Sequence, residues 1–139
     1  MSEVIVTSLN NLRNEVRYAT NHTFITDEPV EAGGDDAGPD PYTLLLAALG
    51  TCTSMTAMLY ARRKAWPVER VTVKLAQRRV HANDCQECTG EEEGFIHRIE
   101  RTVTFEGDLT TEQLDRLQEI VRKCPVHKTL SSKIVIADL

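Results

Sequence analysis

One segment, YTLLLAALGTCTSMTAMLYARRKA (residues 42–65), constrains the fold more than any other part of this sequence. Its apolar and small residues recur at helical spacing, which predicts a long α-helix. Side chains stay apolar or small on all sides as far as Arg62, so most of the helix surface is expected to be buried. Trp66-Pro67 ends the helix. A chain of 139 residues offers little surface to cover such a helix, which favours a dimer that encloses it.

The segments around this helix are predicted to be short strands and loops. The β-branched residues of Val4–Leu9 and Val16–Thr26 predict short strands, with a turn at Asn10-Asn11. The acidic, Pro- and Gly-rich stretch Asp27–Pro41 predicts a loop.

Two longer strands and a second helix are predicted after the long helix. Val68–His81 and Phe95–Phe105 alternate between apolar and polar residues, which predicts a hairpin around the turn region 82–94. Thr110 or Thr111 is expected to cap a helix whose apolar face carries Leu114, Leu117, Val121 and Cys124 and which Pro125 interrupts, and Lys133–Ala137 is expected to form a last strand. This non-alternating order predicts an α+β fold in a single domain, residues 1–139.

Charge and composition exclude several classes of protein. The net charge of −5 argues against a nucleic-acid partner, which requires clustered Lys and Arg. The longest uninterrupted apolar run, Leu44–Leu49, is much shorter than the ~20 residues of a membrane span. The N-terminal residues lack the pattern of a signal peptide, so a cytoplasmic location is expected. Four cysteines in a reducing compartment indicate catalysis, redox sensing or metal binding.

Cys52 and Cys124 are the first candidate site. Cys52 lies midway along the long helix, where a small buried core residue is the simpler interpretation. Cys124 precedes Pro125, which is favoured at the first position of a helix, so Cys124 can cap a short helical turn. Backbone N–H groups there, together with Lys123, His127 and Lys128, would favour a reactive thiolate.

A second candidate site combines the Cys-x-x-Cys motif of the 82–94 turn region with two flanking histidines. His81, Cys85, Cys88 and His97 would provide the four ligands that zinc prefers if they converged at the tip of the hairpin. A reversible disulfide between Cys85 and Cys88, or an exposed pair without a role, are the alternatives.

The stretches GPDPYTLLLAALGTCTSMT (Gly38–Thr56) and EGDLTTEQLDRLQEIVRKCPVHKTL (Glu106–Leu130) resemble the OsmC and Ohr (organic hydroperoxide resistance) superfamily. DEPVEAGG and HANDCQEC resemble its OsmC-like branch. The resemblance extends from about His22 to the end of the chain. It implies an α+β intertwined homodimer with long central helices packed against antiparallel-rich sheets. It also implies that Cys52 attacks a small organic hydroperoxide, that Cys124 resolves the sulfenic acid as a disulfide, and that a lipoyl-type dithiol regenerates the pair without a required cofactor.

The sequence departs from the pattern of active family members at one position. Where active members have a glutamate that works with an arginine, this sequence has Tyr42, followed by Thr43. The stretch that matches the position of the arginine reads Asn21-His22. His22 and His127 are therefore candidate supporting groups. The alternative function is a non-catalytic dimeric protein that binds a ligand or responds to redox state or zinc.

Overall fold

The structure is a computed structural model that describes residues 2–139, and the chain groups into two compact units on either side of Ala47. The boundary lies within the long helix α1 (Pro41–Lys64), whose first turns belong to the N-terminal unit. The single-domain organisation over residues 1–139 stays a prediction.

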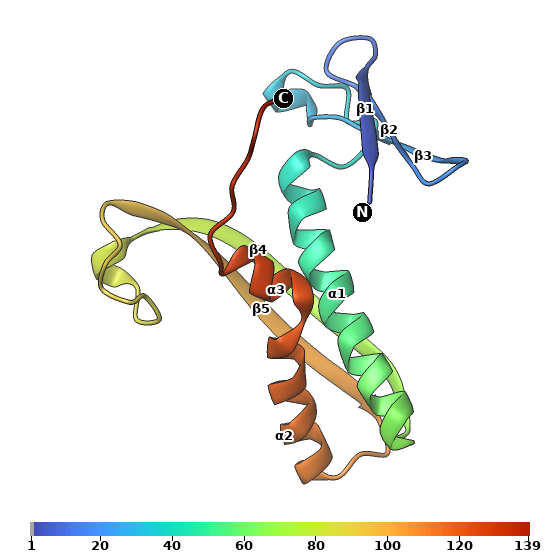
Figure 1. Cartoon of the computed structure of the whole chain (residues 1–139), viewed down its shortest axis with the longest axis vertical. Coiled ribbons are helices and arrows are strands. Elements are labelled where there is room, and N and C mark those ends of the chain that lie inside the picture. Colours follow the sequence, from blue (N-terminus) through green and yellow to red (C-terminus); the bar gives the residue numbers. More distant parts are fainter. Residues whose placement is uncertain (1) are drawn as a thin grey trace. The chain divides into compact units, whose positions relative to one another are not determined.

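The N-terminal unit is a three-stranded antiparallel sheet (Figure 1). Its strands β1 (Val4–Ser8), β2 (Asn14–Tyr18) and β3 (His22–Thr26) follow one another in spatial order. Ala19 adopts a left-handed conformation with φ of 51°, so the predicted Val16–Thr26 segment divides into two strands at a tight turn.

A buried carboxylate organises the loop that follows β3. Asp27 accepts hydrogen bonds from the backbone N–H groups of Glu28 (2.8 Å), Asp35 (3.1 Å) and Ala37 (3.1 Å). Burial acts to raise the pKa of Asp27, but these N–H groups and the charge of Arg13 together hold the pKa below its ordinary value. The loop therefore depends on Asp27 remaining ionised.

Replacing Asp27 with asparagine is expected to accelerate hydrogen exchange at the Asp35 and Ala37 amides roughly tenfold, because an amide NH₂ would face their N–H groups. Because the folded-state pKa is lowered, wild-type protection should persist above the ordinary carboxyl pKa and be lost as the pH falls through the folded-state value. Exchange measured by NMR across acidic pH checks both statements. Glu31→Gln is the control, and equal acceleration in the control would contradict the assignment.

Helix α1 (Pro41–Lys64) begins and ends close to the predicted bounds. Asp40 accepts the Thr43 N–H at 2.7 Å, so an aspartate caps the helix and proline occupies its first position. The helix ends where Ala65 turns to a positive φ of 55°, just before Trp66-Pro67.

The expectation that α1 is buried on most sides is wrong for the single chain. Met55 and Leu59 are 63% and 56% exposed, while Ala57 and Tyr60 on the opposite side lie in the core. The apolar surface that the helix retains is therefore what a second copy of the chain would have to cover.

By length and composition alone, α1 is apolar enough to cross a membrane, with a mean hydropathy of 1.5 over 18 residues. The sequence expectation counted only the uninterrupted run Leu44–Leu49, whereas uncharged Gly, Thr, Cys and Ser extend the apolar stretch. Core helices of soluble proteins meet the same criterion, so this property is weak evidence for a membrane span.

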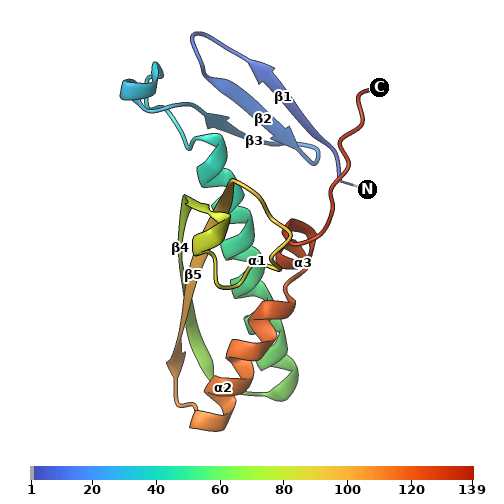
Figure 2. The ribbon, with the colours of Figure 1, turned by 90° about the vertical axis from the view of Figure 1, so that its left-hand side faces the viewer.

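The C-terminal unit packs helices against one long hairpin. Strands β4 (Val68–His81) and β5 (Phe95–Gly107) pair in antiparallel register, as predicted. Helix α2 (Thr111–Ile120) lies beside the end of α1 on one face of this hairpin (Figures 1 and 2). A 3₁₀ turn (Val121–Lys123) then leads into the short helix α3 (Pro125–Leu130).

The core of the C-terminal unit lies between these helices and the inward face of the hairpin. Ala57, Val103 and Val121 form one cluster, and Tyr60, Leu117 and Ile120 form a second. Gly50 lets α1 approach β4 closely, because a Cβ there would lie 2.8 Å from the Leu75 side chain. Thr110 caps α2 in a capping box with Gln113, which confirms one of the two predicted caps.

The prediction of a last strand at Lys133–Ala137 is wrong. The segment has no regular structure, and Val135 and Ile136 are 78% and 86% exposed. A β-branched stretch becomes a strand only when another strand supplies hydrogen bonds, and none within residues 2–139 pairs with it. The α+β prediction itself is confirmed, since residues 2–139 form three α-helices and two antiparallel sheets.

Candidate functional site

The C-terminal unit brings Cys52 of α1 and Cys124 together at the start of α3. Both are free thiols, and the two side chains hydrogen-bond each other. The Val126 N–H donates to Sγ of Cys52 at 3.5 Å, and the His127 N–H donates to Sγ of Cys124 at 3.3 Å. One helical turn therefore holds both sulfur atoms by its backbone.

Cys124 occupies the N-cap of α3 with Pro125 at the first helical position, as the sequence predicted. The capping sulfur is fully buried, whereas Cys52 is partly exposed. Of the two sulfurs, Cys52 is thus the one that a substrate reaches more easily.

The two thiols differ in acidity. Burial raises the pKa of Cys52, and the neighbouring Cys124 adds to the increase. Burial also opposes ionisation of Cys124, but hydrogen bonds from the Cys52 thiol, the His127 N–H and the Thr53 hydroxyl lower its pKa. Of the two thiols, Cys124 is therefore the one that loses its proton at the lower pH.

Arg101 on β5 supplies the positive charge beside this pair. Its Nη1 donates to the Thr53 hydroxyl at 3.0 Å, and its Nη2 lies 3.0 Å from Nδ1 of His127. No carboxylate within residues 2–139 forms an ion pair with this guanidinium, which is partly buried. The Thr53 hydroxyl accepts from Arg101, donates to the Leu49 carbonyl at 2.7 Å and is one of the groups that lower the pKa of Cys124, so Arg101 is linked to that thiol through Thr53.

The sequence interpretation did not identify Arg101, although its position carries a signal. It lies between Ile99 and Val103 in the alternating pattern of β5, at a place where an apolar residue is expected on the inward face. An arginine on the core-facing side of a strand needs a specific polar partner, which here is Thr53 of α1.

His127 is neutral in this arrangement. Burial lowers its pKa, and the charges of Arg101 and Arg122 lower it further. Because a guanidinium only donates hydrogen bonds, Nδ1 of His127 must be the unprotonated nitrogen that accepts from Arg101. The positive charge expected from His127 is therefore provided by Arg101.

An open cleft of about 660 Å³ borders the site. Leu49, Arg101 and His127 line it beside the thiol pair, and Ile99 and Leu130 add apolar surface. Its other lining residues are polar or charged, Glu87, Arg98 and Glu100 among them, so the cleft combines apolar side chains with charges of both signs and suits a small organic molecule with a polar reacting group.

His22 and Tyr42 belong to the N-terminal unit. His22 lies on β3, where its exposed ring stacks on Tyr18 with centroids 5.2 Å apart. Tyr42, at the position of the family glutamate, is exposed in the first turn of α1. A supporting role of His22 stays a prediction.

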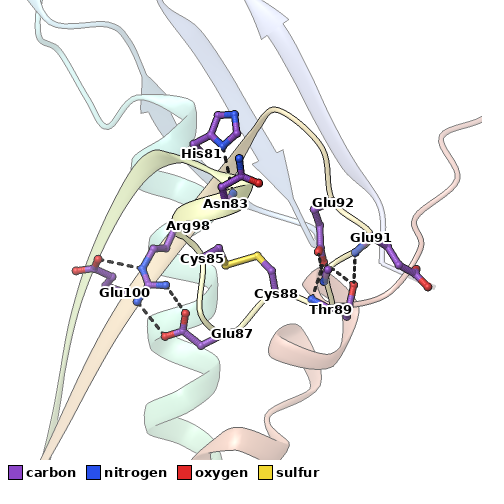
Figure 3. Close-up of a disulfide and its surroundings, with 11 residues drawn as sticks. His81, Asn83, Cys85, Glu87, Cys88, Thr89, Glu91, Glu92, Arg98 and Glu100 are labelled. Carbon is purple, nitrogen blue, oxygen red and sulfur yellow. Dashed lines mark hydrogen bonds and ion pairs between the residues drawn. A yellow bond between two sulfur atoms is a disulfide. The ribbon is translucent and has the colours of Figure 1, made fainter.

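The Cys-x-x-Cys motif forms a disulfide between Cys85 and Cys88 in the loop between β4 and β5 (Figure 3). Nδ1 of His81 accepts the Asn83 N–H at 3.1 Å, and Nδ1 of His97 lies 3.1 Å from the Gln77 amide nitrogen. The structure therefore agrees with one of the interpretations of this motif, a disulfide between Cys85 and Cys88.

Zinc ligation requires thiolates, which a disulfide does not provide. In the part of the chain that the structure describes, no three His, Cys, Asp or Glu side chains gather in a metal-holding arrangement. Zinc at His81, Cys85, Cys88 and His97 thus stays a prediction for the reduced loop.

Comparisons with known proteins agree with this fold. The model of the OsmC-like protein family matches residues 33–137. Similar solved structures include an OsmC like protein from Mycoplasma pneumoniae, at 18% identity over 95% of this chain and 88% of that chain, with a TM-score of 0.73. Among curated proteins, none matches the chain.

Two further structures carry the name organic hydroperoxide resistance protein. The one from Legionella pneumophila is 16% identical over 94% of this chain and 88% of that chain, with a TM-score of 0.65. The one from Elizabethkingia anophelis is 20% identical over 93% and 86%, also with a TM-score of 0.65. At these identities the likeness shows the fold, while the family model covers most of the sequence. The chain belongs to the OsmC-like protein family.

Proposed function

We propose that this protein reduces small organic hydroperoxides through Cys52 and Cys124, with a dithiol as the source of electrons. The observation that carries the proposal is that one turn of α3 holds both sulfurs, of which Cys52 is the partly exposed one, while His127 of the same turn lines an adjoining cleft. The names of two structural neighbours as organic hydroperoxide resistance proteins support the same substrate class.

The first step is attack by Cys52 on the hydroperoxide. As the substrate arrives, the Cys52 proton passes to the adjacent Cys124 thiolate, and the Cys52 thiolate attacks the distal oxygen. The O–O bond breaks, Cys52 becomes a sulfenic acid, and the alkoxide takes the proton held by Cys124 and leaves as an alcohol. The single proton shared by the pair thus ends on the leaving group.

The second step forms the disulfide. The Cys124 thiolate, now without its proton, attacks the sulfenic sulfur of Cys52 and expels hydroxide, which is protonated to water. Arg101 acts in both steps as a positioning residue, because it polarises the Thr53 hydroxyl that supports the charge on Cys124. It would supply the positive charge that an arginine supplies in active family members. Unlike that arginine, Arg101 has no carboxylate partner within residues 2–139.

The resulting disulfide requires two electrons, for which a lipoyl-type dithiol is the proposed donor. Regeneration by a dithiol requires a reducing compartment, so we place the protein in the cytoplasm. No metal or organic cofactor takes part in the proposed reaction.

We also infer that the working form is a homodimer. The support is the exposed apolar side chains of α1, Met55 and Leu59, and the exposed apolar segment Ile134–Ile136, which a solvent-facing monomer would leave uncovered. Sedimentation of the purified protein at several concentrations tests this inference.

The proposed activity is tested by peroxide consumption with dihydrolipoamide as reductant. Cumene hydroperoxide is expected to be consumed at least ~10-fold faster than hydrogen peroxide, because the apolar residues of the cleft favour an organic substituent. Absence of turnover with either peroxide and with every dithiol tried would contradict the proposal and direct attention to ligand or zinc binding.

A further inference from the structure

A second pair of sulfurs lies in the loop between β4 and β5 and has no part in the chemistry proposed above. Cys85 and Cys88 form a disulfide there, while Cys52 and Cys124 are thiols. Both loop cysteines are partly exposed, so a soluble dithiol can approach their bond. The two pairs therefore differ in redox state, and among the four cysteines Cys124 is the buried one.

An ion pair fixes the position of the loop disulfide. Glu87, which lies between the two cysteines, accepts two hydrogen bonds from Arg98 of β5, at 2.6 and 3.1 Å (Figure 3). Arg98 is itself oriented by Glu100 at 3.1 Å. The side-chain hydrogen bond from Arg98 is also the main reason that the pKa of Glu87 is lowered. The Cys-x-x-Cys motif is thus attached to the strand that carries Arg101.

The remainder of the loop is held by its own hydrogen bonds. Glu92 accepts from the Thr89 N–H (3.2 Å), the Thr89 hydroxyl (2.9 Å) and the Gly90 N–H (3.1 Å) (Figure 3). The Ala82 N–H donates to the Gly94 carbonyl at 2.8 Å and closes the base of the loop. The loop is therefore anchored at its base, at Glu87 and at Glu92.

One cleft links this loop to the first thiol pair. Glu87 lines the same 660 Å³ cleft as Arg101 and His127. The His127 N–H donates to Cys124, and Arg101 donates to Thr53, the neighbour of Cys52. The cleft thus has Glu87, the residue between the two loop cysteines, and the residues that hold the reactive sulfurs in one lining.

We propose that Cys85 and Cys88, as a reduced dithiol, transfer two electrons across this cleft to the Cys52–Cys124 disulfide, so that the loop is the entry point for the external dithiol. This inference rests on the redox role proposed above for Cys52 and Cys124. The structure contains the state that such a transfer would produce, with the loop oxidised and the pair on α1 and α3 reduced.

The transfer is a pair of thiol–disulfide exchanges. A thiolate of the loop attacks Sγ of Cys52, the Cys52–Cys124 bond breaks, and Cys124 leaves as a thiolate. The second loop cysteine, after losing its proton, attacks the mixed disulfide, which forms the Cys85–Cys88 bond and releases Cys52 as a thiolate that takes up a proton. A lipoyl-type dithiol then reduces the loop disulfide and becomes a cyclic disulfide itself.

The environment of the first pair favours this direction of attack. Cys52 is the partly exposed sulfur, whereas Cys124 is buried and accepts the His127 N–H. A sulfur whose thiolate is stabilised leaves more readily in disulfide exchange. Attack at Cys52 with departure of Cys124 is therefore easier than the reverse.

Trapping of the mixed disulfide tests the proposal without any peroxide chemistry. Cys124→Ser is combined either with Cys85→Ser or with Cys88→Ser, which leaves Cys52 and a single loop cysteine. After oxidation with diamide, at least one of these variants is expected to form a disulfide from Cys52 to the loop, detected by peptide mass mapping. Absence of this disulfide in both variants would overturn the proposal, whereas absence of peroxide turnover alone would affect only the proposed function.

The rate of transfer in the four-cysteine protein gives the second test. One equivalent of cumene hydroperoxide is added to reduced protein, and thiols are alkylated at successive times. The disulfide is expected first at Cys52–Cys124 and then at Cys85–Cys88, at a rate independent of protein concentration. Persistence of the first disulfide beside free Cys85 and Cys88 would overturn the proposal.

The role of the ion pair is tested with Glu87→Gln, which keeps all four cysteines. Transfer is expected to slow roughly tenfold, because release from Arg98 lowers the effective concentration of the loop thiols at the cleft. Glu91→Gln removes the same charge from the same loop, at a residue with no ion pair to Arg98, and should leave the rate unchanged. Equal rates in both variants would show that Glu87 does not position the loop.

Discussion

Replacing Cys52 with serine is expected to lower peroxide turnover roughly a thousandfold or more, whereas replacing Cys124 should still allow a single round of oxidation, slower because the acceptor of the Cys52 proton is lost. Cys52 is the reachable sulfur, and a serine hydroxyl has no comparable nucleophilicity toward the O–O bond. The Cys124→Ser protein keeps the Val126 N–H and the Cys52 sulfur, so its first reaction with peroxide should proceed.

The oxidised species that accumulates distinguishes the two variants. In Cys124→Ser the sulfenic acid of Cys52 has no resolving partner, so intact mass should increase by one oxygen and then by further oxygens as the sulfur is over-oxidised. Cys52→Ser should show no such increase at position 52. Peroxide consumption and intact mass measured on the same samples check both results.

Arg62→Lys is a suitable control, because Arg62 lies on the same helix, is exposed and is not part of the apolar surface assigned to the dimer. Its turnover should match that of the wild type. Over-oxidation at Cys124 in place of Cys52 in the wild-type protein would reverse the assigned roles. Full turnover in Cys52→Ser would exclude this pair from catalysis.

Replacing Arg101 with glutamine is expected to reduce turnover at neutral pH about tenfold, with recovery at higher pH. Without the guanidinium, the Thr53 hydroxyl loses its donor and stabilises the Cys124 thiolate less. The pKa of Cys124 should rise, so that a smaller fraction of this thiol is ionised at neutral pH. The pH–rate profile of Arg101→Gln should therefore shift toward alkaline pH.

Two further measurements distinguish positioning by Arg101 from a purely structural contribution. Arg101→Lys restores the charge and should return the pH profile most of the way to that of the wild type. The pKa of His127 is lowered first by burial and then by the charge of Arg101, so it should rise in Arg101→Gln, as followed by NMR. Arg70→Gln removes an exposed arginine near the open end of the hairpin, away from Arg101 at its middle, and serves as the control. An unchanged pH profile in Arg101→Gln would contradict the assigned role.

Several elements were predictable because local chemistry specifies them. Periodicity alone indicated α1 and the β4–β5 hairpin, since a helical or alternating pattern persists for many residues in each. The cap at Cys124 was predictable for a similar reason, because proline after a capping residue favours a helix start.

Elements that depend on a distant partner were predicted less well. The segment Lys133–Ala137 has strand-like residues, but it is not a strand because no neighbouring strand accepts it. The exposed side chains of α1 show the same dependence, since a single chain has no layer left to cover Met55 and Leu59.

What the sequence by itself determined is the α+β class, the bounds of the main elements, the family, and the two residues most suited to thiol chemistry. Only the tertiary structure decided that one turn of α3 donates hydrogen bonds to both Cys52 and Cys124, that Arg101 reaches Thr53, and that Cys85 bonds to Cys88. The physical reason is the distance along the chain over which each kind of interaction acts. Caps and periodic patterns act within a few residues, whereas the acidity of a thiol depends on charges and hydrogen bonds that packing brings from other elements.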